Sequence, residues 1–589
     1  MLLDKVNQPQ DLKNFSLQEL TALSEEIRQV LLRKINATGG HFGPNLGFIE
    51  PTVAMHYVFN CPTDKFVFDV SHQCYTHKIL TGRKSYFTDP AKYHEISGYT
   101  NPAESPCDNF VVGHTSTAPS LAVGLAMARD LKQEKHHVLA VIGDGSLSGG
   151  EAFEGLDNAG ALKSNIIIVV NDNEMSIAPN HGGLYGNLAL LRQTQGAAQN
   201  NYFKALGFDY VYVDQGNDIP ALVAAFEQAK DSPRPVVVHL HTLKGKGCAE
   251  AEANKEAFHW ILPGTLDHKK PAAPAVETYD SVSVDYFLKK RAQDPNFIVL
   301  NPATPGAVAL TPQVRAQLGP GFADVGIAEE HAVAAASALA AGGAKPVLAV
   351  LSSFVQRTYD QLSQDLALNN NPATLLVYWG GISAGDATHL GCFDMALVGN
   401  IPNIVYLAPT NKEEYLAMLD WAVEQKKHSV AIRVPFGPLV HSDRPVAADY
   451  ADLNRFERVE KGTEVALVGL GNFFHLARRV QEELQKSLGI RATLINPRYI
   501  SGVDQELLQS LQKDHRLVIT LEDGVKAGGF GEKVAAFYGP TDMKVLSYGA
   551  DKVFTDRVPI EQLYARYRLT PQQIVQDVAA CLKKQEGVY

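Results

Sequence analysis

Short apolar runs of strand length alternate with helical patterns along most of the chain. A first helix is predicted over residues 11–36, where leucine and isoleucine recur at helical spacing after a possible N-cap at Ser16. Continuous β-branched runs between helices are typical of parallel strands covered on both faces. The predicted strands are residues 65–70, 110–112, 138–142, 166–170, 210–213 and 236–240, then 298–300, 347–351, 375–378, 404–407 and 430–434, then 465–470, 492–495, 517–521 and 545–547.

These runs fall into three groups, which predicts three successive α/β domains. The first ends at a proline- and alanine-rich stretch, residues 263–275, that is typical of a linker. The second ends at an irregular stretch, residues 441–452. We therefore predict domains over residues 1–276, 277–450 and 451–589, with no comparable cluster of reactive residues in the third, which we interpret as a packing and dimer-supporting domain.

Composition narrows the class of protein. A chain of 589 residues with 45% hydrophobic and 20% charged residues is typical of a soluble globular protein with several domains. The formal net charge of −11 argues against a nucleic-acid-binding surface. We find no secretory leader at the amino terminus and no apolar stretch of membrane-spanning length. The six cysteines lack CxxC spacing and predict reduced thiols in a cytoplasmic protein.

The chemistry of the chain centres on a β–α–β unit over residues 138–177. Its first strand ends in Gly143-Asp144-Gly145, and its second ends in Asn171-Asp172-Asn173. Open α/β sheets bind ligands at the carboxyl ends of their strands, and a helix amino terminus favours an anion. Asp144 and Asn173 offer the oxygen ligands that Mg²⁺ prefers. A Gly-Asp-Gly sequence alone is also a common turn, so the interpretation depends on the second strand end.

Other predicted strand and loop ends carry polar residues. Four histidines lie at such positions, and each alone is as compatible with a structural role as with a functional one: His41, His72, His77 and His114. The basic glycine loop at residues 244–247 is either a phosphate contact or a solvated turn. Residues 182–201 are polar and predict a mobile loop beside the Mg²⁺ site. The acidic pair at Glu329 could simply be first-turn carboxylates favoured by the helix dipole.

Two separate segments, GDGSLSGGEAFE and NDNEMSI, together resemble the thiamine diphosphate fingerprint. Three α/β domains in this order resemble the transketolase superfamily. Within this superfamily, the amino-acid sequence is similar to the 1-deoxy-D-xylulose-5-phosphate synthase family over most of the chain. The similar segments are HFGPNLGFIE, DVSHQCYTHKILTGR, GHTST, HTLKGKG, GIAEEHAV, SSFVQRTYDQ, THLGCFD and LEDGVKAGGFG. The resemblance implies two thiamine-diphosphate-binding doubly wound sheets followed by a transketolase C-terminal domain, in a homodimer.

The resemblance also implies the cofactors, thiamine diphosphate and Mg²⁺, and a role for each matching position. The positions that match Mg²⁺ ligands are Asp144, Asn173 and the Met175 carbonyl, and these also belong to the cofactor site. The residues that match further cofactor contacts are His72, Gly113, His114, Thr115, Gly145 and Ser146. Phe354 matches the aromatic residue that stacks on the aminopyrimidine, and Glu329 matches the glutamate that forms a hydrogen bond with the pyrimidine ring. Catalytic positions match Glu329, His41, His72, His389, Asp386 and Arg357.

Departures from the family gather in the expected acceptor pocket. Leu351 stands where members usually have tyrosine, and Trp379 and Phe436 stand where they have arginines. Since arginine suits phosphate through its planar fork, this pocket is expected to hold an aldehyde phosphate poorly. Four alternatives therefore stay open: a synthase joining pyruvate to glyceraldehyde 3-phosphate, the same donor chemistry with a changed aldehyde, a transketolase, and a catalytically silent binding paralogue.

Overall fold

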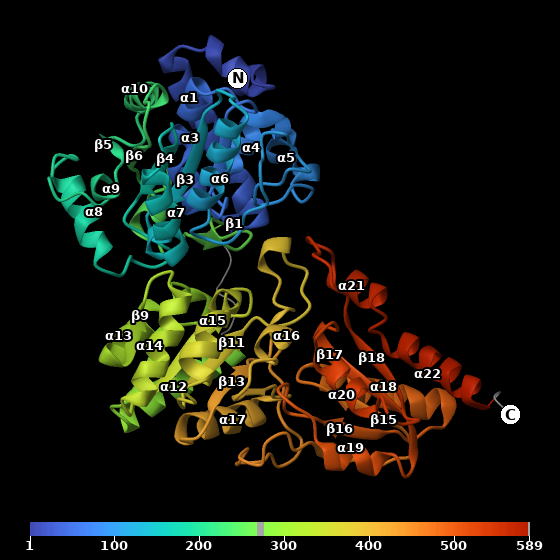
Figure 1. The fold of residues 1–589 in the computed structure, drawn as a ribbon. Coiled ribbons are helices and arrows are strands. Elements are labelled where there is room, and N and C mark those ends of the chain that lie inside the picture. The colour runs from blue at the N-terminus through green and yellow to red at the C-terminus, as the bar shows by residue number, and fades with distance from the viewer. Residues whose placement is uncertain (268–275, 587–589) are drawn as a thin grey trace. The chain divides into compact units, whose positions relative to one another are not determined.

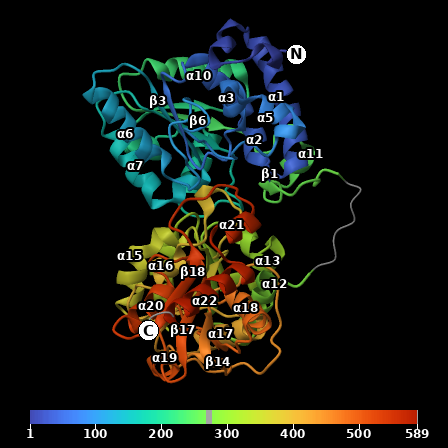
Figure 2. The same ribbon diagram turned by 90° about the vertical axis from the view of Figure 1, so that its right-hand side faces the viewer.

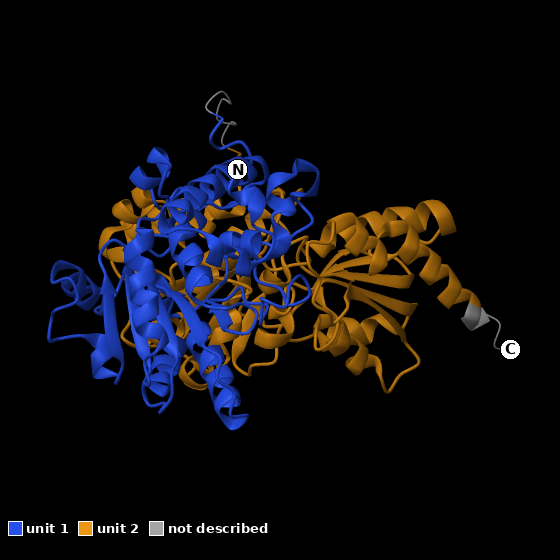
Figure 3. Cartoon of the chain, turned by 90° about the horizontal axis from the view of Figure 1, so that it is seen from above, with its two compact units in different colours: residues 1–273, 325–328 blue, residues 274–324, 329–589 orange. Residues whose placement is uncertain are grey.

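The computed structural model describes residues 1–267 and 276–586, and its chain divides into two compact units (Figure 3). Unit 1 comprises residues 1–273 and 325–328, and unit 2 comprises residues 274–324 and 329–589. Within the described ranges no helix is both long and apolar enough to cross a membrane. The predicted limits between three domains stay predictions, and most of the expected linker lies outside the described residues.

Unit 1 is built around a five-stranded parallel sheet with the order β2-β3-β4-β6-β5. The strands are β2 (Lys65–Phe68), β3 (Val138–Gly143), β4 (Ile167–Asp172), β5 (Asp209–Val213) and β6 (Val236–His241). Residues 138–142 and 166–170 are fully buried, because helices cover both faces of the sheet. A two-stranded antiparallel ribbon joins β1 (Gly40–His41) to β7 (Trp260–Ile261).

The helices of unit 1 form two layers on this sheet. They are α1 (Leu17–Thr38), α2 (Gly43–Gly47), α3 (Ile49–Val58), α4 (Tyr75–Lys78), α5 (Ser85–Thr88), α6 (Ala118–Leu131), α7 (Gly150–Gly160), α8 (Leu184–Gln193), α9 (Tyr202–Ala205), α10 (Ile219–Lys230) and α11 (Ala249–Ala253). One core joins α1, α3 and α10 to the sheet, and a second joins α6, α7 and α8 to it. Helices α6 and α7 lie side by side (Figures 1 and 2).

Unit 2 contains two sheets. The first is parallel, with the order β12-β13-β11-β10-β8-β9, and the second has the order β14-β16-β15-β17-β18 with only β14 antiparallel. Their strands are β8 (Phe297–Asn301), β9 (Phe322–Asp324), β10 (Lys345–Leu351), β11 (Thr374–Tyr378), β12 (Ile404–Leu407) and β13 (Ser429–Arg433), then β14 (Glu457–Glu460), β15 (Glu464–Gly469), β16 (Thr493–Asn496), β17 (His515–Val525) and β18 (Lys544–Ala550).

The longer helices of unit 2 cover these sheets. One core joins α12 and α17 to the first sheet, and another joins α18, α21 and α22 to the second (Figure 1). The helices are α12 (Tyr279–Gln293), α13 (Pro312–Leu318), α14 (Glu329–Ala341), α15 (Tyr359–Gln361), α16 (Asp394–Val398), α17 (Lys412–Glu424), α18 (Phe473–Leu488), α19 (Gln505–Leu511), α20 (Phe530–Tyr538), α21 (Ile560–Arg566) and α22 (Pro571–Glu586).

Two local predictions are wrong. Residues 110–112 form no strand, because side chains occupy the main-chain acceptors that a strand would use. The Thr100 hydroxyl donates to the Phe110 carbonyl at 2.8 Å, and the Ser71 hydroxyl donates to the Val112 carbonyl at 2.6 Å. Residues 182–201 are not simply a loop: half of the segment is helix α8, whose Leu188 and Leu191 enter the core. Leu184, Leu188 and Leu191 recur at helical spacing, a pattern that the polar and small residues on both sides of the helix concealed.

Candidate active site

The first predicted ligand, Asp144, lies at the carboxyl end of β3. Its side chain is buried, and one carboxylate oxygen accepts a hydrogen bond from Asn180 Nδ2 at 2.7 Å. Burial and the nearby charge of Asp172 raise the pKa of Asp144 to about 7. At Gly145 an added Cβ would lie 2.9 Å from the Cα of Ser176, so glycine is required where this turn meets the turn after β4. The two motif ends are therefore in contact, as predicted.

The three polar residues at the end of β4 have different partners. Asn171 accepts a hydrogen bond from Thr242 at 2.5 Å, and Asp172 pairs with His239 at 2.9 Å and with Arg192 at 2.6 Å. By contrast, the side-chain oxygen of Asn173 is buried and has no hydrogen-bond partner. An unsatisfied buried oxygen at this place fits a missing ligand.

These donors suit Mg²⁺. Asp144 and Asn173 offer hard oxygens from the ends of the neighbouring strands β3 and β4. Met175 lies in the turn that follows β4, where the main-chain N–H of Ser176 donates to the Ala178 carbonyl at 3.0 Å. No group of three or more His, Cys, Asp or Glu able to hold a metal occurs in the described parts of the chain. An aspartate, an amide and a main-chain carbonyl would not form such a group, so the predicted ligand set stays a proposal.

Two lysines approach the turn that carries these ligands. The Nζ of Lys244 donates to the Ser176 carbonyl at 2.6 Å, and the Nζ of Lys255 donates to the Asn173 carbonyl at 3.3 Å. Lys244 is 2% exposed, and burial lowers its pKa to about 7. Lys244 is thus not part of a solvated turn, and its amine lies against the turn that carries the predicted ligands.

The predicted loop over residues 113–117 lies against the Gly145–Ser148 turn. Ser116 Oγ donates to the Ser146 carbonyl at 2.9 Å, and an added Cβ at Gly149 would lie 2.1 Å from the same hydroxyl oxygen. Asp69, after β2, accepts hydrogen bonds from the main-chain N–H groups of Ser116 and Ala118. The structure therefore brings the segment Gly113-His114-Thr115 next to the segment Gly145-Ser146.

Three histidine rings gather at the β1–β7 ribbon. His41 and His72 have ring centroids 4.9 Å apart, and His259 lies 5.6 Å from His41 and 5.5 Å from His72. The amide of Asn45 ties the first two together by donating to both of their carbonyls at 2.7 Å. Burial, with help from the charge of Lys244, holds the pKa of His259 well below its usual range.

His259 was missed by the sequence analysis, because it belongs to no recognisable motif. Its position is fixed instead by the pairing of Gly40 with Ile261, a contact between segments more than two hundred residues apart. His77, another of the four histidines at predicted strand and loop ends, lies elsewhere. It is fully buried, and its ring nitrogens lie 2.9 Å from His56 Nε2 and 2.9 Å from Asp108 Oδ1.

Two predicted site residues of unit 2, Glu329 and Arg357, lie at the start of α14. Glu329 is 3% exposed, its Oε2 has no hydrogen-bond partner, and Arg357 Nη1 lies 3.6 Å away. Burial raises the pKa of Glu329 to about 7, although Arg357 opposes the shift. The helix dipole favours a charged first-turn carboxylate, whereas burial favours the neutral form of Glu329, so this residue is not a solvated first-turn carboxylate.

Two further predicted residues lie together in the same unit. The ring of His389 lies edge-on to that of Phe354, with centroids 5.8 Å apart. His389 Nδ1 shares a hydrogen bond with the Thr388 hydroxyl at 2.8 Å, and burial lowers the pKa of His389 to about 4. The ring is therefore neutral at pH 7. Asp386 begins the same short turn, η10 (Ala387–His389).

The acceptor-pocket departures separate into two kinds. Leu351 ends β10 inside the hydrophobic core, 4% exposed. Trp379 and Phe436 are 47% and 51% exposed, and Trp379 has a φ of +58° that residues other than glycine rarely adopt. Only these two can form an apolar wall. The predicted third domain also reaches the end of strand β13, because Asp523 of β17 forms an ion pair with buried Arg433. We did not predict this ion pair from the sequence.

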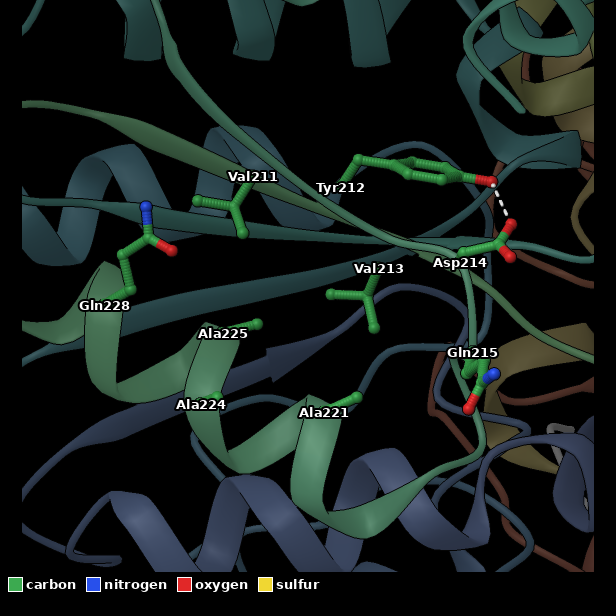
Figure 4. A pocket seen from close by; sticks show the side chains of 9 residues that line it. All are labelled: Val211, Tyr212, Val213, Asp214, Gln215, Ala221, Ala224, Ala225 and Gln228. Carbon is green, nitrogen blue, oxygen red and sulfur yellow. Dashed lines mark hydrogen bonds between the residues drawn. The ribbon is translucent and has the colours of Figure 1, made fainter. Parts of the chain in front are cut away.

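A separate pocket of about 390 Å³ lies between the edge strand β5 and helix α10 (Figure 4). Its lining is mostly small and apolar, with the Tyr212 hydroxyl donating to Asp214 at 3.1 Å (Figure 4). None of the predicted site residues lines it, so it is not the candidate active site.

Comparison with known proteins identifies the class. Residues 3–200 match the family model described as 1-deoxy-D-xylulose-5-phosphate synthase, residues 281–438 match the transketolase pyrimidine binding domain, and residues 454–574 match the transketolase C-terminal domain. These matches confirm the predicted α/β fold of transketolase type with three domains.

Curated relatives match over the full chain. The 1-deoxy-D-xylulose-5-phosphate synthase of Symbiobacterium thermophilum is 38% identical, covering 99% of this chain and 95% of its own. That of Brevibacillus brevis is 36% identical over 100% of both chains, and synthase 1 of Geobacter sulfurreducens is 37% identical over 96% of this chain and 95% of its own. The chain belongs to the 1-deoxy-D-xylulose-5-phosphate synthase family.

Proposed function

We propose that this protein is a transferase that decarboxylates pyruvate and joins the remaining two carbons to glyceraldehyde 3-phosphate, with thiamine diphosphate and Mg²⁺ as cofactors. The observation that carries the activity is full-length similarity to curated synthases at 36–38% identity. Such an activity serves isoprenoid and thiamine biosynthesis. The buried oxygens of Asp144 and Asn173 support the choice of Mg²⁺.

When bound, thiamine diphosphate supplies a nucleophilic carbon and an electron sink for decarboxylation. Asp144, Asn173 and the Met175 carbonyl would hold the metal, and the segments 113–115 and 145–146 would hold the cofactor in unit 1. Phe354 would present an aromatic face to the aminopyrimidine. Glu329 would hold a proton at its carboxyl group and share it with a ring nitrogen, a task that suits a buried carboxyl with a pKa of about 7.

The histidines would bind and orient the substrate. Burial lowers the pKa of His389, so its ring is neutral at pH 7 and would orient the substrate through hydrogen bonds. His41 and His72, whose main-chain carbonyls accept hydrogen bonds from Asn45, would bind substrate, and Arg357 and Asp386 would orient it. The proposal includes a homodimer, and the six unpaired cysteines fit the reducing environment of the cytoplasm.

Product analysis of the purified protein tests the proposal. Reactions containing Mg²⁺, thiamine diphosphate and pyruvate would receive glyceraldehyde 3-phosphate, D-glyceraldehyde or no aldehyde. Efficient formation of the phosphorylated deoxyketose is expected. A further reaction would contain a ketose phosphate in place of pyruvate. Consumption of that donor would instead identify a transketolase.

One observation favours a second candidate with the same donor and a different acceptor. Trp379 and Phe436 place exposed aromatic surface where charged side chains were expected. A clear preference for D-glyceraldehyde over its phosphate would support this candidate and contradict the first.

A further inference from the structure

The segment between β18 and α21 lies against the loop that carries Asp386 and His389. The main-chain N–H of Arg557 donates to the Gly385 carbonyl at 2.9 Å, and the N–H of Ala387 donates to the Asp556 carboxylate at 3.1 Å. These two hydrogen bonds run in opposite directions and fix the segment to the loop. The third region of the chain therefore contacts the loop that carries two predicted catalytic residues, although we interpreted it from the sequence as a packing and dimer-supporting domain.

The side chain of Arg557 points along this contact. Its Nε lies 3.8 Å from Asp386 Oδ1, and its Nη2 donates to Asp556 Oδ2 at 3.1 Å. Arg557 has a φ of +51°, a left-handed conformation that is uncommon outside glycine. Such outliers persist where the surrounding structure holds them, and they gather at functional sites.

Three arginines of unit 2 differ in how deeply they are buried and in which carboxylates they face. The Arg433 side chain is 4% exposed and lies between Asp394 and Asp523, so its charge is neutralised inside the protein. The Arg357 side chain is 14% exposed and faces Glu329. The Arg557 side chain is 31% exposed, so of the three it is the one that a solvent-borne anion can best reach.

We propose that Arg557 binds the phosphate of the aldehyde acceptor and so determines the specificity for phosphorylated aldehydes. This inference rests on the proposed function. Trp379 and Phe436, the exposed aromatic residues of the expected acceptor wall, carry no charge, so the anion requires a cation from another segment. The planar guanidinium of Arg557 offers paired donors that match phosphate oxygens, and a phosphate can displace its water-exposed contacts with Asp556.

Steady-state kinetics with two acceptors tests this role. Arg557→Met keeps the length of the side chain and removes its charge, while Arg557→Lys keeps the charge and loses the fork. With saturating pyruvate, Arg557→Met is expected to raise the KM for glyceraldehyde 3-phosphate at least about tenfold and to leave kcat/KM for D-glyceraldehyde within about twofold. Arg557→Lys should recover part of the loss. The matched control is Arg566→Met, an exposed arginine of α21 that stacks on Tyr567.

Equal losses with both acceptors, or no loss with either, would overturn the inference. A second measurement keeps the test valid if Arg557→Met loses all turnover. Glycerol 3-phosphate should raise the thermal midpoint of the wild type and of Arg566→Met, but not of Arg557→Met; equal shifts in all three would contradict binding by Arg557. If the wild type makes no product from glyceraldehyde 3-phosphate, the proposed function itself has failed, and the two failures are thereby distinguished.

Discussion

A buried ionic network in unit 1 predicts a large effect for Asp108→Asn. The Asp108 carboxylate accepts hydrogen bonds from Arg83 at 2.7 and 2.8 Å and from the Asn101 N–H at 2.7 Å, and its Oδ1 pairs with His77 Nε2 at 2.9 Å. The side chains of Asp108 and His77 are fully buried, and that of Arg83 is 6% exposed. The substitution keeps the shape but leaves the guanidinium with only the more distant and less buried Glu104, at 3.3 Å, as its counter-charge.

The size of the effect follows from this geometry. Removing one partner of a buried ion pair costs about 3–5 kcal/mol. Because about 1.4 kcal/mol corresponds to a tenfold change in an equilibrium constant, the unfolding equilibrium of unit 1 should shift by roughly two to nearly four orders of magnitude. Native-state hydrogen exchange at the amides of β2 and β3 measures this shift as lost protection.

A surface pair in the same unit provides the control. Asp209 lies 3.8 Å from Arg234, and both side chains are about half exposed, so Asp209→Asn should change protection by less than about threefold. If Asp108→Asn behaved like Asp209→Asn, the reasoning about the buried network would be refuted.

The same network predicts a pH dependence. Burial opposes ionisation of Asp108, but the hydrogen bonds from Arg83 and His77 hold its pKa well below its usual range. A lowered folded-state pKa means that the stabilisation is complete above the unfolded value of about 3.9 and is lost as the pH falls below it. The difference between wild type and Asp108→Asn should therefore begin to shrink near pH 4 and go on shrinking as the pH falls further toward the folded-state pKa, measured by the same exchange method.

Three further predictions concern the candidate site. Glu329→Gln removes the exchangeable carboxyl proton and should lower kcat by about 10²- to 10⁴-fold while the fold is kept, as circular dichroism would verify; turnover within about twofold of wild type would refute the role of Glu329. Asn173→Ala removes the unsatisfied buried oxygen and should raise the Mg²⁺ concentration needed for half-maximal activity at least about tenfold, with an unchanged requirement as the contradictory result. Since burial lowers the pKa of His389 to about 4, its ring should stay neutral as the pH falls from 7 to 5, and nitrogen NMR that found it protonated at pH 6 would contradict the assigned burial.

Much of the fold could be predicted because its signals are local. Parallel strands buried on both faces require continuous apolar runs, and residues 138–142 and 166–170 supplied them. The Ser16 cap of α1 was equally local, since its hydroxyl accepts from the Glu19 N–H at 3.2 Å within one turn. Strands β9 and β14 were missed because they are short edge strands with few buried residues.

The site was only partly predictable for the opposite reason. Asp144 and Asn173 follow strands directly, so parallel pairing alone predicts that they meet. His259 and Arg557 reach their places through a β-ribbon and a loop contact whose partners lie more than one hundred residues away in the sequence. No local pattern records such contacts, and charge or aromaticity in the sequence does not reveal burial.

The reaction that we propose joins two carbons of pyruvate to an aldehyde phosphate with loss of CO₂. Incubation of purified protein with uniformly ¹³C-labelled pyruvate, unlabelled glyceraldehyde 3-phosphate, thiamine diphosphate and Mg²⁺ tests it directly. We predict a five-carbon ketose phosphate that carries two adjacent labelled carbons, with one labelled CO₂ released for each molecule formed. Labelled CO₂ without any labelled ketose phosphate, or no reaction of pyruvate, would contradict the account.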